Sequence, residues 1–151
     1  MRFREFGKIV VPDTIPGFAG PLAGVLAGLD HAEKKGFSHI VTVAVDTPFF
    51  PKNLVSKLAK VAINYGGLTI ISSINEDTKK IKQHPTFGMW PCHLRKNLEF
   101  HLMSGQRKIV IWTKKQNAGY TSYKTSNYDP FFNINTYADL QYAINNFERM
   151  I

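Results

Sequence analysis

The stretch HIVTVAVDTPFFP, residues 39–51, constrains the fold more than any other part of the chain. Its β-branched residues would point to both faces of an extended strand, which is typical of a parallel strand covered by helices on both sides. The apolar run ends at Asp46, and Pro48 disfavours a helical conformation at Thr47, so the next helix cannot begin at once. We therefore expect a central buried strand over 39–45 with a carboxylate at its carboxyl end.

The rest of the chain alternates between strand-like and helix-like patterns, which predicts an α/β domain. A helix is expected to open at Pro21 and to end near Gly36, with an apolar stripe at helical spacing made of Leu22, Val25, Leu26 and Leu29. Further strands are predicted over 8–11, 68–74 and 84–90. Further helices are predicted from Pro51, over 94–103, and after Thr136, whose capping partner would be Asp139. Residues 107–115 fit a helix and a strand equally.

Length and composition indicate one globular domain over 1–151, with 44% hydrophobic and 20% charged residues. No run is apolar enough for a bilayer span, and no secretory signal is visible, so we expect a cytoplasmic protein that does not engage a membrane. The net charge of +8 suggests an anionic partner. Because the lysines are dispersed, phosphate-bearing small molecules are favoured and nucleic acid is not expected.

Asp46 occupies the place where open parallel sheets bind ligands, just outside the carboxyl end of a strand. A carboxylate held there is a suitable ligand for Mg²⁺, which takes one or two protein carboxylates together with waters and substrate phosphates. The alternative is purely structural, because Asp46 can also cap the following helix or form a turn with Pro48. The spacing alone does not separate these two interpretations.

Five short motifs, in this order, resemble the molybdenum cofactor guanylyltransferases: GPLAG at 20–24, DTPFFP at 46–51, HPTFGMWP at 84–91, SGQRK at 104–108 and FFNINTYADL at 131–140. The resemblance runs through nearly the whole chain. It implies a Rossmann-like nucleotidyltransferase fold with a mostly parallel sheet flanked by helices. The implied reaction transfers GMP from GTP to the molybdopterin form of the molybdenum cofactor and releases pyrophosphate, with Mg²⁺ as the metal.

The resemblance also implies roles for individual residues. Asp46 would hold the metal and contact the nucleotide, and Asp13 would be a second nucleotide-contacting aspartate. The pterin and phosphate side would comprise Asn133, Asn135, His84, Arg107 and Lys108. Structural alternatives stay open, since the asparagines can form a turn before Thr136, the histidine can be a structural residue, and exposed basic residues are usually solvated.

The sequence departs from the family pattern at its start. The glycine-rich loop that cradles the triphosphate in the family is not found in MRFREFGKIVV, so we expect an N-terminally truncated, partial domain in which the Asp46 strand has an unpaired edge. A second polypeptide or a homo-oligomer could supply the missing segment. Two alternative functions therefore remain: an inactive or split-half chain that binds the pterin cofactor or a partner, and a related nucleotidyltransferase with another nucleotide or acceptor.

Overall fold

A four-stranded sheet forms the centre of the computed structural model, which describes residues 3–15, 20–126 and 128–146. The strand order is β1-β3-β2-β4, with β1 (His39–Thr42), β2 (Thr69–Asn75), β3 (Ile81–Pro91) and β4 (Gly119–Thr125). β3 pairs antiparallel with β1 and with β2, whereas β2 and β4 are parallel. The α/β class is confirmed. Strands β1, β2 and β4 run in one direction, as expected for a mostly parallel sheet. β3 lies between β1 and β2 and runs the opposite way, so only the pairing of β2 with β4 is parallel.

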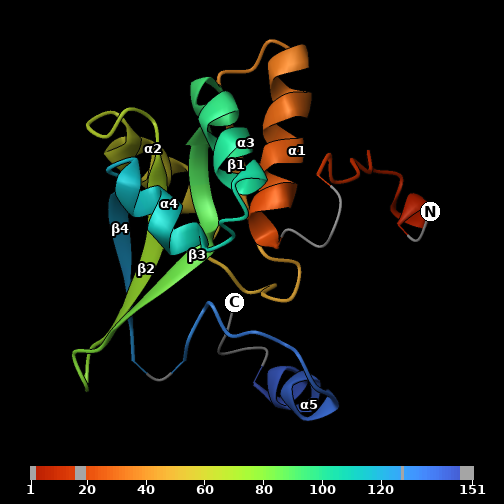
Figure 1. The fold of residues 1–151 in the computed structure, drawn as a ribbon. Helices are drawn as coiled ribbons and strands as arrows, with labels where there is room; N and C mark the ends of the chain where they lie inside the picture. Colours follow the sequence, from red (N-terminus) through yellow and green to blue (C-terminus); the bar gives the residue numbers. More distant parts are fainter. Residues whose placement is uncertain (1–2, 16–19, 127, 147–151) are drawn as a thin grey trace.

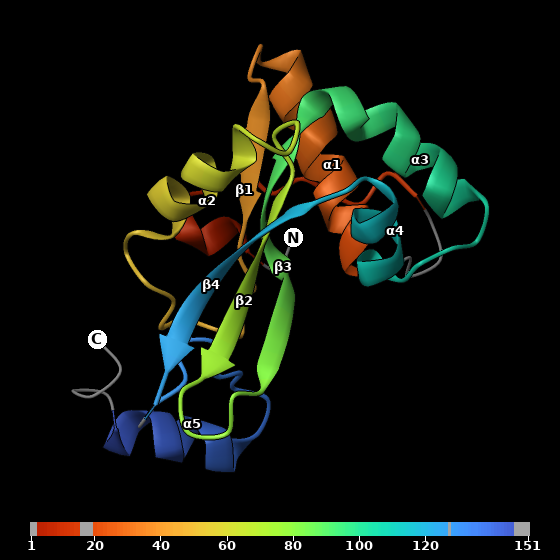
Figure 2. The ribbon, with the colours of Figure 1, turned by 90° about the vertical axis from the view of Figure 1, so that its left-hand side faces the viewer.

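Helices cover both faces of this sheet (Figures 1 and 2). One face carries α1 (Pro21–Lys34), α3 (Arg95–Met103) and α4 (Ile109–Lys115), and the other carries α2 (Leu54–Ala62). α5 (Tyr137–Asn145) lies beyond the ends of the strands. Short 3-10 helices occur at Arg4–Phe6 and Cys92–Leu94. Among the described residues, no helix combines the length and the hydropathy that a bilayer crossing requires.

The core is divided by the sheet into two clusters. The α1-side cluster contains Leu22, Leu26, Ile70, Trp90, Leu98 and Trp112, among others. The α2-side cluster contains Leu54, Leu58, Ile71, Phe87, Tyr123 and Phe131. Adjacent residues of a strand point to opposite faces, so Ile70 and Ile71 of β2 connect one cluster to the other. The predicted stripe of α1 is confirmed, since its four residues are at most 4% exposed.

The expected strand over 8–11 is wrong, because residues 9–13 have no regular secondary structure. Ile9 is 76% exposed, and this segment pairs with no described strand. A strand this short has no stability without pairing, which accounts for the difference. β1 also ends at Thr42, three residues earlier than expected, and it lies at one end of the described sheet.

The HPT motif forms an irregularity in β3. Pairing with β2 shifts register between Ile70, which lies opposite Gly88, and Ile71, which lies opposite His84. Residues 85–87 therefore form a bulge on β3. Pro85 suits this position because it has no N–H to donate to a neighbouring strand. Phe87, at the end of the bulge, packs into the α2-side cluster.

Candidate functional site

Asp46 lies in the turn that follows β1, and its side chain is half-buried. The turn is held by a backbone hydrogen bond from Thr47 N to Ala44 O, 3.3 Å. The backbone carbonyl of Asp46 accepts from Ile134 N at 2.8 Å. Two segments almost ninety residues apart in the chain, the DTP turn and the FNINT loop, are therefore joined by their backbones.

Side chains strengthen the same junction. Thr47, which is fully buried, donates its hydroxyl to Asp46 Oδ1 at 3.1 Å and to Asn133 Oδ1 at 3.0 Å. Asn133 Nδ2 donates to Asp46 Oδ2 at 3.3 Å. A hydroxyl has a single proton, so the two acceptors share it. The result is a closed triangle of Asp46, Thr47 and Asn133 that fixes the direction of the carboxylate.

Thr47 was missed as a site residue by sequence reasoning. A threonine between an aspartate and a proline is typical of a turn, and its burial and its bond to Asn133 depend on the distant loop. The only signal in the sequence was its place inside the DTP motif.

The Asp46 site could hold a divalent cation. Each carboxylate oxygen accepts one hydrogen bond from a neutral group, which leaves lone pairs available, and the side chain is reachable from solvent. Within the described ranges, no three acidic, histidine or cysteine side chains gather closely enough to form a metal cage. The donor set therefore suits a cation that takes one carboxylate and completes its shell with waters and phosphate oxygens, as Mg²⁺ does.

His84 is a buried residue that contacts the segment leading to Asn133. The ring is only 6% exposed, its Nε2 lies 2.8 Å from Ser73 Oγ, and it stacks on Phe131 with ring centroids 4.3 Å apart. Burial lowers the pKa of His84 to about 4, although Asp129 acts in the opposite direction. The imidazole is neutral at pH 7, so it positions the Phe131 segment and does not offer a charge to phosphate.

The remaining predicted residues are distributed around the molecule. Asn135 is exposed, and its backbone N–H donates to Asp139 Oδ2 at 3.0 Å. Asp13 is exposed and lies beside the first turns of α1, with Oδ1 4.0 Å from the position of a Cβ added at Gly24. Neither is joined to Asp46 by any contact described above.

Arg107 and Lys108 belong to a different hollow. They line a cavity of about 400 Å³ before α4, together with His101 and Gln106. Asp46 and Asn133 do not line this cavity. His101 is 7% exposed and its Nε2 has no hydrogen-bond partner among the described residues. The structure therefore separates the basic pair from the Asp46 triangle.

An α/β sheet whose acidic turn after β1 is hydrogen-bonded to a distant asparagine loop is typical of a nucleotidyltransferase-type domain. The chain belongs to the family described as the MobA-like NTP transferase domain, whose model matches residues 1–118. It is 41% identical over 147 residues to the molybdenum cofactor guanylyltransferase of Rhizobium meliloti (strain 1021), covering 91% of this chain and 64% of that protein. It is 37% identical over 145 residues to the protein of the same name from Bradyrhizobium sp. (strain ORS 278), covering 94% and 66% respectively.

A solved structure shows the same fold. Molybdopterin-guanine dinucleotide biosynthesis protein A from Archaeoglobus fulgidus superposes with a TM-score of 0.59 at 24% identity, over 85% of this chain and 63% of that one. The chain thus spans about two thirds of the length of these relatives, 64% and 66% for the two guanylyltransferases. The predicted family is confirmed.

Proposed function

We propose that the chain contributes the metal and acceptor side of a guanylyl transfer, in which GMP passes from GTP to molybdopterin. The observation that carries this proposal is the triangle of Asp46, Thr47 and Asn133, which fixes a carboxylate beside an amide at the carboxyl end of β1. The similarity to proteins named molybdenum cofactor guanylyltransferase supports the choice of substrates.

In the proposed reaction, an oxygen of the terminal phosphate of molybdopterin attacks the α-phosphorus of GTP. A new phosphoanhydride bond forms, the bond between the α-phosphorus and the oxygen bridging to the β-phosphorus breaks, and pyrophosphate leaves. Asp46 would hold the cation, which we take to be Mg²⁺ and which would neutralise charge on the transferring group when bound. Thr47 and Asn133 keep the Asp46 carboxylate in one orientation.

The other predicted residues take supporting roles in this proposal. Asp13 would contact the nucleotide, and Asn135 would contact the acceptor near Asn133. Arg107 and Lys108 would bind a phosphate from their own cavity. A partner polypeptide or a second copy of the chain, and a cytoplasmic location, stay predictions from the sequence.

The decisive experiment measures transfer of labelled GMP from α-labelled GTP to molybdopterin, with and without Mg²⁺. We expect Asp46→Asn to lower Mg²⁺-dependent transfer by at least ~100-fold, because the amide cannot neutralise a bound cation. Asp77→Asn is the matched control, since Asp77 is an exposed acid on the β2–β3 turn, and it should retain transfer within about twofold. Near-normal transfer by the Asp46 variant would remove Asp46 from the mechanism.

The same assay separates the two alternative functions. A chain that binds molybdopterin but shows no affinity for GTP would contradict guanylyl transfer and favour a binding-only, split-half role. Transfer from another nucleoside triphosphate at a higher rate than from GTP would favour a related transferase.

A further inference from the structure

The loop that carries Asn133, residues 128–136, joins β4 to α5 outside any helix or strand, so its shape depends on other contacts. Three aspartates accept hydrogen bonds from its backbone N–H groups. Asp129 accepts at the start of the loop, the backbone carbonyl of Asp46 in the middle, and Asp139 at the end. Asp46 belongs to the candidate site and Asp139 to the first turn of α5, whereas Asp129 fixes the start of the loop.

Asp129 closes a tight turn. Its Oδ1 accepts from Phe131 N at 2.9 Å, and its backbone carbonyl accepts from Phe132 N at 3.0 Å. A side chain of aspartate or asparagine that accepts from the backbone two residues on forms an Asx turn, and the longer glutamate side chain does not match this geometry. Pro130, inside the turn, is buried. The direction in which the chain leaves Asp129 is therefore set by the position of one carboxylate oxygen.

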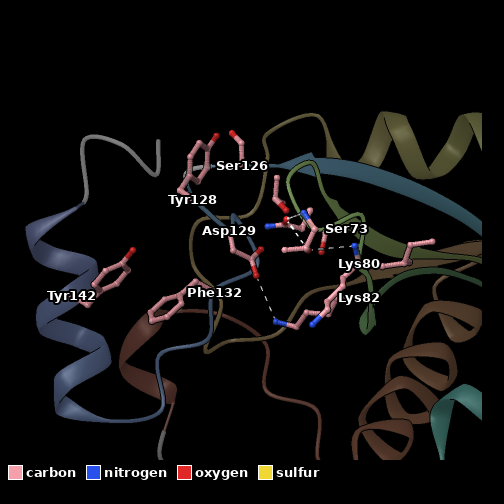
Figure 3. A pocket seen from close by; sticks show the side chains of 12 residues that line it. Ser73, Lys80, Lys82, Ser126, Tyr128, Asp129, Phe132 and Tyr142 are labelled. Carbon is pink, nitrogen blue, oxygen red and sulfur yellow. Dashed lines mark hydrogen bonds and ion pairs between the residues drawn. The ribbon is translucent and has the colours of Figure 1, made fainter.

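The same loop is attached to β3 at two points. Lys82 and His84 are two residues apart on β3, so their side chains point to the same face. Lys82 Nζ lies 3.5 Å from Asp129 Oδ2, and Figure 3 shows these two side chains directed toward each other. His84 stacks on Phe131, which is likewise two residues from Asp129. One contact would let the loop pivot, whereas two contacts at matched spacing fix its direction across the sheet.

The hydrogen bond of Asp129 contributes more to this direction than the ion pair does. The Lys82 side chain is 62% exposed and that of Asp129 is 34% exposed, and exposed ion pairs contribute little to stability. The bond from Phe131 N is assisted by the charge of the carboxylate. Phe131 is fully buried, so an N–H that lost its acceptor there would have little access to water. The loop therefore depends mainly on the acceptor atom Asp129 Oδ1.

The direction of the loop decides where Asn133 meets Asp46. Asn133 lies four residues after Asp129, and its Nδ2 donates to Asp46 Oδ2 at 3.3 Å, which is at the long end of the hydrogen-bond range. Ile134 N donates to the backbone carbonyl of Asp46 at 2.8 Å. A small rotation of the loop would break the longer of these two bonds first. The orientation of the Asp46 carboxylate is therefore sensitive to the turn that Asp129 closes.

We propose that Asp129 is a positioning residue for the transfer reaction. Through the turn that it closes at Phe131, it holds Asn133 against Asp46 and so fixes the carboxylate that would bind the cation. The loop requires the acceptor geometry of Asp129 and not its charge. The effect on transfer rests on the proposed function, whereas the effect on the loop does not.

Amide hydrogen exchange of the whole chain, measured per residue by NMR at neutral pH, tests the effect on the loop. Ile134 N–H reports the junction with Asp46, and Ile71 N–H on the central strand β2 reports opening of the whole fold in the same spectra. We expect Asp129→Glu to raise exchange at Ile134 about 10-fold relative to Ile71, because the longer side chain displaces the acceptor. Asp129→Asn keeps a carbonyl oxygen in place and should stay within about 3-fold of the wild type.

The labelled-GMP assay tests the effect on the reaction. We expect Asp129→Glu to lower kcat about 10-fold through misplacement of the carboxylate, and Asp129→Asn to retain kcat within about 3-fold. In an Asn133→Ala background, Asp129→Glu should lower transfer by less than about twofold more, because both residues act on the same link.

Two controls separate this role from the loss of a surface charge. Lys82→Gln removes the ion pair alone and should retain exchange and transfer within about twofold. Asp77→Glu makes the same substitution at an exposed acid on the β2–β3 turn and should leave both measurements within about twofold of the wild type.

The two measurements fail in different ways. Equal exchange at Ile134 in the Asp129→Glu and Asp129→Asn variants would overturn the proposal, whatever the transfer assay shows. Faster exchange without slower transfer, or a full further loss of transfer in the Asn133→Ala background, would also overturn it. If the wild type itself transferred no GMP, the proposed function would fail, and exchange at Ile134 would still decide whether Asp129 sets the loop.

Discussion

His84 is the residue through which the sheet supports the candidate site. It contacts Ser73 on β2 and stacks on Phe131, two residues before Asn133. Burial is the largest cause of its lowered pKa, so the imidazole that stacks on Phe131 is uncharged at neutral pH. Protonation of this one side chain would therefore disturb both the α2-side cluster and the loop that orients Asp46.

The pH dependence of stability tests this role. The folded pKa of His84 is about 4 against a normal value of 6.5, so the unfolded chain binds the proton more readily. The stability that the neutral His84 imidazole contributes is complete above pH 6.5 and is lost as the pH falls toward 4. We expect the wild type to lose about 2 kcal/mol more unfolding free energy over this range than His84→Gln, which cannot titrate.

Urea titrations of both proteins at several pH values between 4 and 7 measure this difference. Asp129 and Lys82, whose charges act on the ring, are present in both proteins, so the difference between the two proteins reports the imidazole. Parallel stability curves for wild type and variant would show that His84 does not titrate as described.

Single residues also show what the sequence could predict about the site. Asp46 and Asn133 were both named from motifs that resemble the family, because spacing alone left Asp46 open between a metal ligand and a turn residue. The contact between them was not predictable, since it depends on Thr47 being buried and on Phe131 being held by His84. Arg107 and Lys108 were grouped with them by motif alone, whereas the structure gives them a cavity of their own.

At the scale of the element, α5 is the helix whose start was predicted in full. Thr136 Oγ1 accepts from Asp139 N at 3.1 Å, and Asp139 Oδ2 accepts from Thr136 N at 2.8 Å, which forms a capping box. The hydrogen bond with the side chain of Thr136 is the largest cause of the lowered pKa of Asp139. The cap matters because Ala143 is the only residue of the described part of α5 counted as buried.

Removal of this cap should loosen α5 without unfolding the domain. Thr136→Val keeps the shape and loses the hydroxyl, so we expect the amides of α5 to exchange about 5-fold faster, equivalent to about 1 kcal/mol. Thr136→Ser retains the hydroxyl and is the matched control. Hydrogen-deuterium exchange measured per residue distinguishes them, and equal protection in both variants would show that the box contributes nothing.

Local sequence patterns did not predict the secondary structure of two elements, α4 and β4. The segment over 107–115 fitted two periods, and the structure resolves it as helix α4 because Ile109 and Trp112 both pack into the α1-side cluster. β4 was not predicted. Its burial alternates along Gly119–Thr125, but its sequence, GYTSYKT, is polar and resembles a loop until β2 supplies a parallel partner.

On the scale of the whole molecule, β2 makes the two clusters depend on each other. Ile70 and Ile71 are at most 1% exposed and face opposite sides. The chain has two tryptophans, and both Trp90 and Trp112 lie in the α1-side cluster with rings 6.0 Å apart. Tryptophan fluorescence therefore comes from residues on one face of the sheet.

Because β2 contributes to both clusters, we expect a destabilising substitution in the α2-side cluster to be detected by tryptophan fluorescence as well. Leu58 is fully buried in the α2-side cluster, so Leu58→Ala should lower the free energy of unfolding by about 2 to 5 kcal/mol. If the sheet transmits this loss, the denaturation midpoint measured by tryptophan fluorescence shifts together with the midpoint measured by far-ultraviolet circular dichroism. Leu140→Ala, the same substitution at a residue that is 40% exposed, should cost less than about 1 kcal/mol. A fluorescence midpoint unchanged in Leu58→Ala would instead mean that each face of the sheet unfolds independently.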